Sequence, residues 1–214
     1  MDIVTGVGVL DKTVAVLRAV AAEPRSLADL QQATDLPRAT AHRLAVALER
    51  HGLLRRDDDG RFDLGPELAA MGRAAAERYP LATLARPVLE HLRNTSGESV
   101  QLFVRDGAQR RCVLSLQSPH ALRWIVPEGV LFPLDAGSAG KALTGGAGNA
   151  GWVASVEERE AGVASVSAPV TAADGSIVAA VSVSGPIDRM TRQPGKRFGG
   201  LVVAAAADVA GLLA

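Results

Sequence analysis

The sequence has little of what covalent chemistry and metal sites need. It contains one cysteine, Cys112, in 214 residues, which excludes an internal disulfide and a cysteine-based zinc or iron–sulfur site. Cys112 lies in an apolar run, where a small buried hydrophobe is a more common role than a nucleophile. The histidines are His42, His51, His91 and His120, and no pair has the H-x-x-x-H or H-x-H spacing of metal ligands. We therefore predict no cofactor, no metal site and no catalytic residues.

The sequence also lacks a net charge and a long apolar run. Basic and acidic residues number 23 each, so no global field draws the chain to nucleic acid or to a membrane surface. No run of about 18 apolar residues and no charged-then-apolar leader occurs, and we expect a cytoplasmic protein without membrane contact. A hydrophobic content of 48% is enough for packed cores in one large domain or two modest ones.

Residues 26–52 have the pattern of two short helices joined by a tight turn. Ser26 is a favourable N-cap, and Asp29 completes a capping-box pattern. Pro37 stands where a first-turn proline costs no hydrogen bond. In the second helix one face is apolar (Ala41, Leu44, Ala45 and Leu48). Its opposite face is basic, which fits either a solvated helical hairpin or a nucleic-acid surface.

A short hairpin pattern follows directly and favours the nucleic-acid surface. Residues 53–56 and 61–64 resemble strands, and Asp59-Gly60 supplies the turn. A helix-turn-helix followed by a basic hairpin is typical of a winged module, whose second helix enters the major groove of double-stranded DNA. Acids slightly outnumber bases in the first 65 residues, so we expect a local basic patch. The residues predicted to contact operator DNA are Ser26, Arg38, Ala39, Thr40, His42, Arg43, Arg55, Arg56 and Arg61.

The remaining sequence predicts helices and an antiparallel sheet. Residues 67–79 and 81–96 have helical apolar spacing, with Leu68, Met71, Ala75 and Tyr79 on one side of the first helix. The predicted strands are 99–105, 111–116, 122–126, 130–133, 162–170 and 176–184, and the predicted later helices are 137–143 and 197–213. This order of elements predicts an α+β fold for the second half of the chain.

Several stretches together resemble the IclR family of bacterial transcriptional regulators. Residues 7–68 are similar to its winged-helix domain, and DAGSAGKAL (135–143) and GWVASVEEREAGVASVSAPV (151–170) are similar to its effector-domain signatures. MDIVTGVGVLDK and PVLEHLRNTSGESVQL resemble the actinobacterial regulators of leucine and related amino-acid biosynthesis. The resemblance implies a winged helix-turn-helix at 1–65, a linker helix at 66–80 and a GAF-like antiparallel-sheet effector domain at 81–214, in a homodimer or tetramer.

The resemblance also implies a small-molecule site. It places the pocket at Ser138, Ala139, Ser165, Ser182 and Ser184. The glycine-led helix start at 137 offers free backbone N–H groups that suit a carboxylate, although serines that alternate along strands can equally face solvent. No buried arginine is evident nearby, so we expect a small carboxylate or amino acid. Only Thr144–Ala150 stand where the family has a much longer connection beside the pocket.

We therefore predict a DNA-binding regulator of metabolic genes, specifically of amino-acid biosynthesis, that responds to a small effector. Two alternatives remain at this point. One is a metabolic enzyme on a GAF-like scaffold, and the other is a winged-helix module that contacts only proteins.

Overall fold

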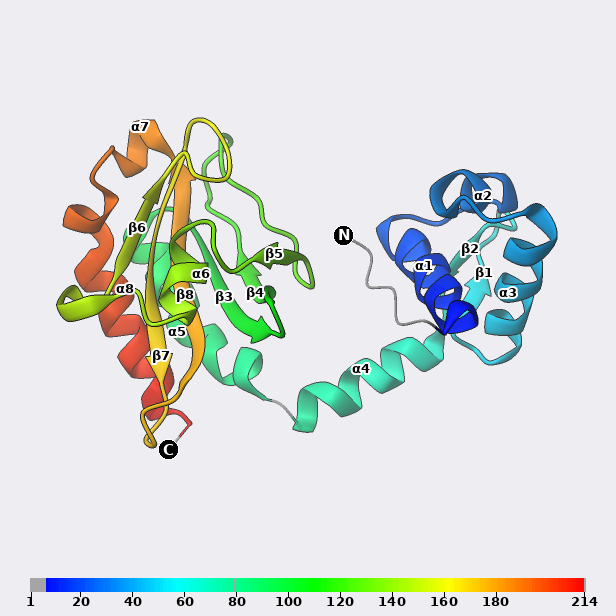
Figure 1. Cartoon of the computed structure of the whole chain (residues 1–214), viewed down its shortest axis with the longest axis horizontal. Helices are drawn as coiled ribbons and strands as arrows, with labels where there is room; N and C mark the ends of the chain where they lie inside the picture. Colours follow the sequence, from blue (N-terminus) through cyan, green and yellow to red (C-terminus); the bar gives the residue numbers. More distant parts are fainter. Residues whose placement is uncertain (1–6, 79, 214) are drawn as a thin grey trace. The chain divides into compact units, whose positions relative to one another are not determined.

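The computed structural model describes residues 7–78 and 80–213 and divides into two compact units, residues 1–78 and 79–214 (Figure 1). The predictions that concern residues 1–6 and Tyr79 lie outside the described residues. Each unit has its own buried core. Within 7–78 and 80–213, we find no helix with the length and apolar character that a bilayer crossing requires.

The first unit has the predicted helix-turn-helix and hairpin, preceded by one further helix. Its elements are α1 (Gly8–Ala22), α2 (Leu27–Thr34), α3 (Arg38–Arg50), β1 (Leu54–Arg56), β2 (Phe62–Leu64) and α4 (Pro66–Arg78). Its core consists of Val16, Val20, Leu30, Ala45, Leu48, Leu54 and Phe62. The antiparallel hairpin is held to the segment before α2, because the Phe62 N–H donates to the Arg25 carbonyl at 2.7 Å and the Arg25 N–H donates to the Phe62 carbonyl at 2.9 Å.

The second unit is an antiparallel sheet with helices, which confirms the α+β class. Its elements are α5 (Leu81–Ser96), β3 (Ser99–Asp106), β4 (Gln109–Leu116), β5 (Leu131–Pro133), α6 (Ser138–Leu143), the short 3-10 helix η1 (Gly148–Ala150), β6 (Val153–Val156), β7 (Val163–Thr171), β8 (Ile177–Pro186), α7 (Ile187–Met190) and α8 (Pro194–Gly211). The strand order is β5-β4-β3-β8-β7-β6, and every neighbouring pair is antiparallel. The predicted strand at 122–126 is irregular instead, and β6 was not predicted.

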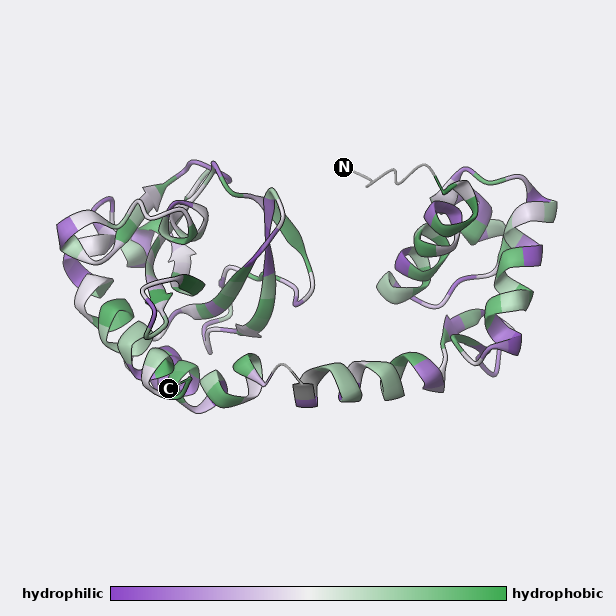
Figure 2. Cartoon of the chain, turned by 60° about the horizontal axis from the view of Figure 1, so that its bottom comes forward, coloured by the Kyte–Doolittle hydropathy of each residue, from purple (hydrophilic) through white to green (hydrophobic). Residues whose placement is uncertain are grey.

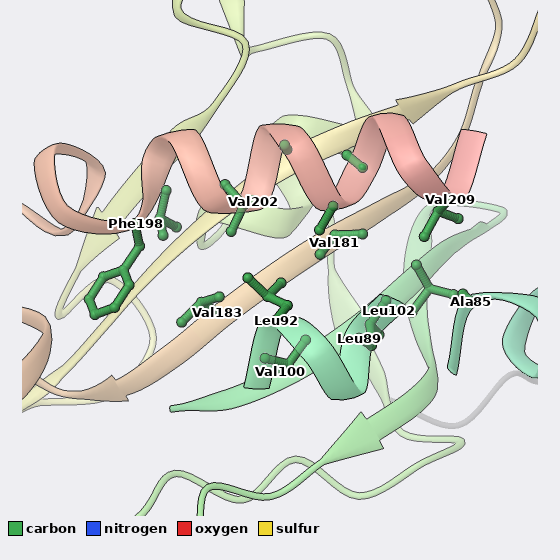
Figure 3. Packing of buried hydrophobic residues seen from close by; sticks show 14 of the residues in the cluster. Ala85, Leu89, Leu92, Val100, Leu102, Val181, Val183, Phe198, Val202 and Val209 are labelled. Carbon is green, nitrogen blue, oxygen red and sulfur yellow. The ribbon is translucent and has the colours of Figure 1, made fainter. Parts of the chain in front are cut away.

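The two faces of this sheet differ because successive side chains of a strand point to opposite faces. One face is apolar and packs against α5 and α8, where Leu92 and Val202 meet Val100, Val181 and Val183 (Figure 3). The other face carries polar residues at the intervening positions, namely Gln101, Ser165, Ser167, Ser182 and Ser184. This polar face is covered by α6, whose Ser138 bonds to the serines of β7.

A β-bulge decides which residues of β4 reach the polar face. The register of β3 against β4 shifts between Leu102 and Phe103, so β4 has one extra residue there. Leu114 consequently lies in the core beneath α5 and α8, whereas Cys112 packs on the side of α6. Two residues further from the bulge, Arg110 lines the same cavity as the serines.

Candidate functional site

The predicted helix-turn-helix is built by a capped α2 and a sharp turn into α3. Ser26 accepts a hydrogen bond from the Asp29 N–H at 3.3 Å, and the Ser26 N–H donates to the Asp29 carboxylate at 3.1 Å. This capping box confirms the predicted start of α2. The helix ends at Asp35, which adopts the left-handed conformation with φ of 52°. The Ser26 hydroxyl accepts the capping hydrogen bond, so this side chain stabilises the start of α2. Its contact with DNA stays a prediction.

The exposed face of α3 brings most of the predicted DNA contacts together. Arg38, Ala39, His42 and Arg43 are exposed, and Thr40 is half-buried. The opposite face buries Ala41, Ala45 and Leu48. Among the described residues, Arg38 and Arg43 have no ion-pair or hydrogen-bond partner. Their guanidinium groups are therefore available to an external anion.

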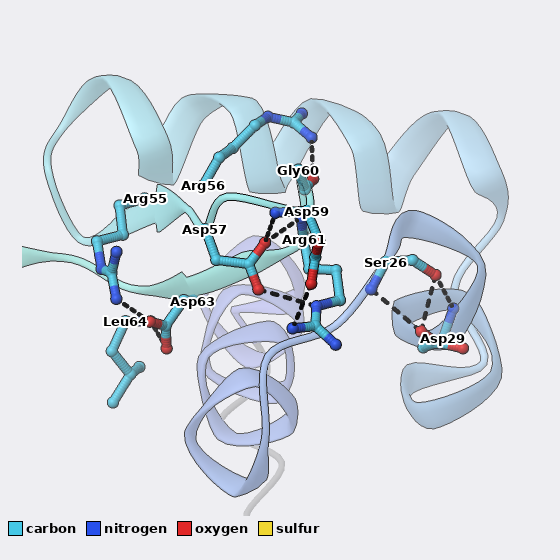
Figure 4. A network of polar contacts seen from close by, with 10 residues as sticks. All are labelled: Ser26, Asp29, Arg55, Arg56, Asp57, Asp59, Gly60, Arg61, Asp63 and Leu64. Carbon is cyan, nitrogen blue, oxygen red and sulfur yellow. Dashed lines mark hydrogen bonds and ion pairs between the residues drawn. The ribbon is translucent and has the colours of Figure 1, made fainter.

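The hairpin arginines are, by contrast, already paired with acids of the same unit (Figure 4). Arg55 forms an ion pair with Asp63. Arg61 contacts Asp57 at 2.8 Å and Asp59 at 3.1 Å. Hydrogen bonds from the Ser26 hydroxyl and backbone N–H lower the pKa of Asp29. At the hairpin, burial would raise the pKa of Asp57, but hydrogen bonds from the backbone and side chain of Arg61 hold it below its ordinary value. The hairpin tip thus carries little surplus positive charge.

Arg56 is held in a different way from the other two hairpin arginines. Its guanidinium donates to the Gly60 carbonyl at 2.7 Å and lies 3.4 Å from Glu49 of α3. It also lies 4.1 Å from the centre of the buried Phe62 ring. Arg56 therefore links the hairpin to α3. Its ion pair with Glu49 is exposed to solvent, and a single exposed ion pair contributes little to stability.

The five residues predicted for the effector pocket line one cavity of the second unit. They are Ser138, Ala139, Ser165, Ser182 and Ser184. The cavity measures ≈ 30 Å³, much smaller than an apolar cavity of about 150 Å³ that accepts benzene. Whether these residues bind an effector stays a prediction.

A chain of hydroxyl groups connects three elements across this cavity. The Ser138 hydroxyl lies 2.7 Å from that of Ser165 and 2.8 Å from that of Ser167. Ser167 in turn donates to Ser182 at 2.9 Å. Because hydroxyls both donate and accept, this chain can reverse its direction around a bound polar group.

The start of α6 differs from the prediction of free backbone N–H groups. The Gly137 N–H donates to the Glu158 carboxylate at 3.0 Å, and Glu158 also pairs with Lys141 at 2.6 Å. Burial would raise the pKa of Glu158, but the bonds from Lys141 and Gly137 hold it below its ordinary value. The prediction of a free cradle is therefore wrong at Gly137, because a side chain of the same chain occupies it.

The expectation that no buried arginine lies near the pocket is also wrong. Arg110 is 1% exposed and lines the cavity, together with the 1% exposed Gln101. The strand prediction began at Arg111, so it left out Arg110, which is buried in the same alternation as Cys112 and Leu114. Burial raises the pKa of Cys112 to about 12, so this thiol stays protonated at neutral pH. In the described parts of the chain, histidine, cysteine and acidic residues form no cluster of three suited to a metal ion.

Family models identify the class of protein. The model described as IclR helix-turn-helix domain matches residues 9–58, and the model described as bacterial transcriptional regulator IclR C-terminal matches residues 73–147 and 146–211. The chain belongs to the IclR family. The two pieces of the second match meet within Thr144–Ala150, the segment that is short in this chain. Members of the IclR family are transcriptional regulators and not enzymes, and they bind operator DNA and small-molecule effectors.

Individual relatives agree with the family models. The HTH-type transcriptional regulator KipR of Bacillus subtilis is 31% identical over 118 residues, which is 55% of this chain and only about half, 47%, of KipR. The transcriptional repressor IclR of Escherichia coli is 25% identical, with 86% of this chain and 81% of that protein covered. An IclR homolog from Microbacterium hydrocarbonoxydans, solved with 4-hydroxybenzoate, has a TM-score of 0.81 at 21% identity and covers 96% of this chain and 98% of its own. The last similarity shows a shared fold.

Proposed function

We propose that this IclR-family regulator binds operator DNA with the exposed face of α3 and responds to a small acid bound in the cavity of its second unit. The observation that carries the proposal is that the residues of α6, β7 and β8 that the family resemblance assigned to a pocket line one cavity. In this proposal residues 1–65 form the DNA-binding domain, 66–80 a linker helix and 81–214 the effector-binding domain.

The DNA surface in this proposal depends mainly on α3. Arg38 and Arg43 are exposed and carry charges that no described carboxylate neutralises. Guanidinium groups in the major groove read guanine by paired hydrogen bonds, while phosphate contacts position the protein. Arg55 and Arg61 can contact phosphates only if they exchange Asp63, Asp57 and Asp59 for the DNA backbone.

The effector in this proposal is a small carboxylate or amino acid. Serine hydroxyls suit a carboxylate and one further polar group, because each hydroxyl donates and accepts. A carboxylate, 4-hydroxybenzoate, is the molecule bound in the Microbacterium homolog that shares the fold. The ≈ 30 Å³ cavity is too small for a whole organic acid, so binding requires side chains at its edge to move. Arg159, an exposed residue that lines the cavity and lies 3.7 Å from the Phe132 ring centre, is placed to do so.

We further propose that the regulated genes belong to amino-acid biosynthesis and that the protein acts as a homodimer or tetramer. The pathway is supported by the similarity of MDIVTGVGVLDK and PVLEHLRNTSGESVQL to regulators of leucine biosynthesis. The assembly is supported by α4, which carries apolar residues along its length (Figure 2), with Met71 58% exposed. Two modules that read half-sites one helical turn apart give more specificity than one module.

A thermal-shift panel of amino acids and small carboxylic acids tests the effector assignment. A ligand that binds only the native state raises the free energy of unfolding by about 2.7 kcal/mol when its concentration is 100 times the dissociation constant. We expect at least one acid to raise the melting temperature of the wild type, and Ser182→Val and Ser184→Val to reduce that rise. Thr171→Val, which also replaces a hydroxyl by valine but at an exposed position of β7, is the control. Equal shifts in all four proteins, or no shift with any acid, contradict the assignment.

A further inference from the structure

The cavity contains two buried nitrogen atoms that hydrogen-bond to nothing in the described residues. They are Nε of Arg110 and Nε2 of Gln101. Both side chains are 1% exposed, and both line the cavity with the serines. Unsatisfied buried donors are rare in folded proteins because each costs about 1–3 kcal/mol. Two in one cavity therefore indicate a site that awaits an acceptor.

Arg110 is in addition a buried cation that forms no ion pair within 4 Å among residues 7–78 and 80–213. Its Nη1 donates to the Pro133 carbonyl, and its guanidinium carbon lies 5.5 Å from the ring centres of Phe103 and Phe132. Burial, and then the neighbouring charge of Arg159, lower the pKa of Arg110 to about 10, against the opposing effect of the Asp135 carboxylate. The group therefore remains a cation at neutral pH, and a buried charge without a partner is strongly unfavourable.

The guanidinium lies against the start of α6, where the serine hydroxyls also converge. A Cβ atom on Gly140 would lie 2.6 Å from Arg110 Nη1, and one on Gly137 would lie 3.4 Å from Nη2. A Cβ on Gly140 would meet the Leu134 carbonyl oxygen even sooner, and one on Gly137 would lie 3.1 Å from Arg159 Cδ, so glycine leaves room here for the guanidinium and for these neighbours. Across the cavity, the Ser184 hydroxyl donates to Gln101 Oε1 at 2.8 Å, which leaves the NH₂ end of that amide to be satisfied.

We propose that Arg110 is the anion receptor of the effector site and that it binds a carboxylate group of the ligand, with the Gln101 amide as a second donor. This inference rests on the proposed effector function and narrows it, since it requires a ligand with an ionised carboxylate and excludes neutral ligands. One guanidinium matches one carboxylate in a paired, charge-assisted geometry. The serines of β7, β8 and α6 then contact the part of the ligand next to the carboxylate.

The test compares acids with their neutral amides. Benzoate and benzamide, 4-hydroxybenzoate and 4-hydroxybenzamide, leucine and leucinamide, and 4-methyl-2-oxopentanoate and its amide are titrated into the full-length protein, by calorimetry and thermal shift. We expect the wild type to bind at least one acid and to bind its amide at least tenfold more weakly. Within this panel, a preference for leucine or for the acids without an amino group distinguishes amino acids from other carboxylates.

The variants locate the receptor. Arg110→Gln is expected to weaken acid binding at least tenfold and to abolish the preference for acid over amide, and Arg110→Lys is expected to keep part of it. Arg111→Gln is the control, because the neighbouring Arg111 pairs with Asp106 instead. A second, ligand-independent readout is the melting temperature without ligand, which should stay unchanged or rise in Arg110→Gln because a buried unpaired charge is removed.

The outcomes separate this inference from the proposed function. If acids bind and Arg110→Gln binds them as the wild type does, the receptor is elsewhere, while the effector function stands. If the wild type binds amides as tightly as acids, the ligand class is wrong. If no acid binds and Arg110→Gln melts well below the wild type, Arg110 is a structural residue, and both this inference and the proposed acid effector fail.

Discussion

Arginine side chains in the first unit differ in whether a carboxylate already neutralises them. On α3, Arg38 and Arg43 have no carboxylate partner in the described chain, whereas Arg55 and Arg61 of the hairpin are paired with aspartates. Because the free energy of binding DNA comes largely from charges that replace condensed counter-ions, the two groups should contribute unequally. The consequences can be measured one residue at a time.

Arg43→Ala should weaken operator binding by about 1–3 kcal/mol and relax specificity at the bases that it contacts. The reason is the loss of an unpaired guanidinium on the exposed face of α3. Operator affinity and a panel of single-base operator variants measure both effects, with Arg105→Ala of the second unit as a control. Unchanged affinity and specificity in Arg43→Ala would mean that α3 is not the recognition helix.

Asp59→Asn should strengthen DNA binding and steepen its salt dependence. The change removes one of the two carboxylates that hold Arg61, so this arginine gains freedom to contact a phosphate. One additional phosphate contact steepens the plot of log affinity against log salt concentration by about one unit. Asp208→Asn makes the same change of charge on α8 and serves as the control. Weaker binding in Asp59→Asn would show that the hairpin acid itself assists recognition.

At the scale of elements, the sequence correctly predicted the helices and strands whose local signals agree with their packing. Ser26 and Asp29 form the predicted capping box, and α5 begins and ends at the residues that apolar spacing predicted. The predicted strand at 122–126 failed because its carbonyls are bound by side chains instead of a strand: the Ser99 hydroxyl donates to Trp124 at 2.6 Å and Arg189 donates to Leu122 at 2.9 Å. Such long-range bonds leave no local pattern.

The candidate site was predicted in the same uneven way. The resemblance to the family assigned its serines to a pocket, and the alternation of Ser165, Ser182 and Ser184 along β7 and β8 left a solvent-facing role equally open. Arg110 reaches the cavity only because the bulge beside Phe103 resets the alternation of β4, and a bulge of this kind has no signal in its own residues. Gln101 was missed because a polar residue within a strand does not reveal which face of the sheet will be covered.

The packing of α8 against Trp152 depends on glycine residues of the helix. Gly195 and Gly199 lie against the Trp152 ring, and a Cβ on Gly199 would lie 2.6 Å from the indole nitrogen, whereas one on Gly200 would meet nothing within 4 Å. Gly199→Ala should therefore lower the free energy of unfolding by about 1–3 kcal/mol through overpacking. Gly200→Ala, its matched control, should raise it by about 0.5–1 kcal/mol through helix propensity. Denaturant unfolding of both variants measures the difference, and equal effects would contradict the packing of Trp152 in this groove.

At the scale of the whole molecule, we expect a dimer or larger assembly with α4 in the contact. Leu68, Met71 and Ala75 lie on one side of this helix, and the chain itself leaves Met71 58% exposed. Met71→Glu places a charge in an apolar contact and should shift sedimentation towards the monomer at micromolar concentration. Arg73→Glu on the same helix is the control. A wild type that is monomeric and still protects a full palindromic operator would contradict the assembly.

The central claim is that a small acid in the cavity changes the affinity of the protein for its operator. The most direct measurement is the operator dissociation constant of the full-length protein with and without a saturating acid from the panel, on an operator taken from genomic footprinting. A coupling of about 1–3 kcal/mol, or 5–150-fold, is typical of allosteric regulators, and we predict a change in this range that is lost in Ser182→Val and Arg110→Gln. An acid that binds the wild type tightly and leaves its operator affinity unchanged would contradict the account.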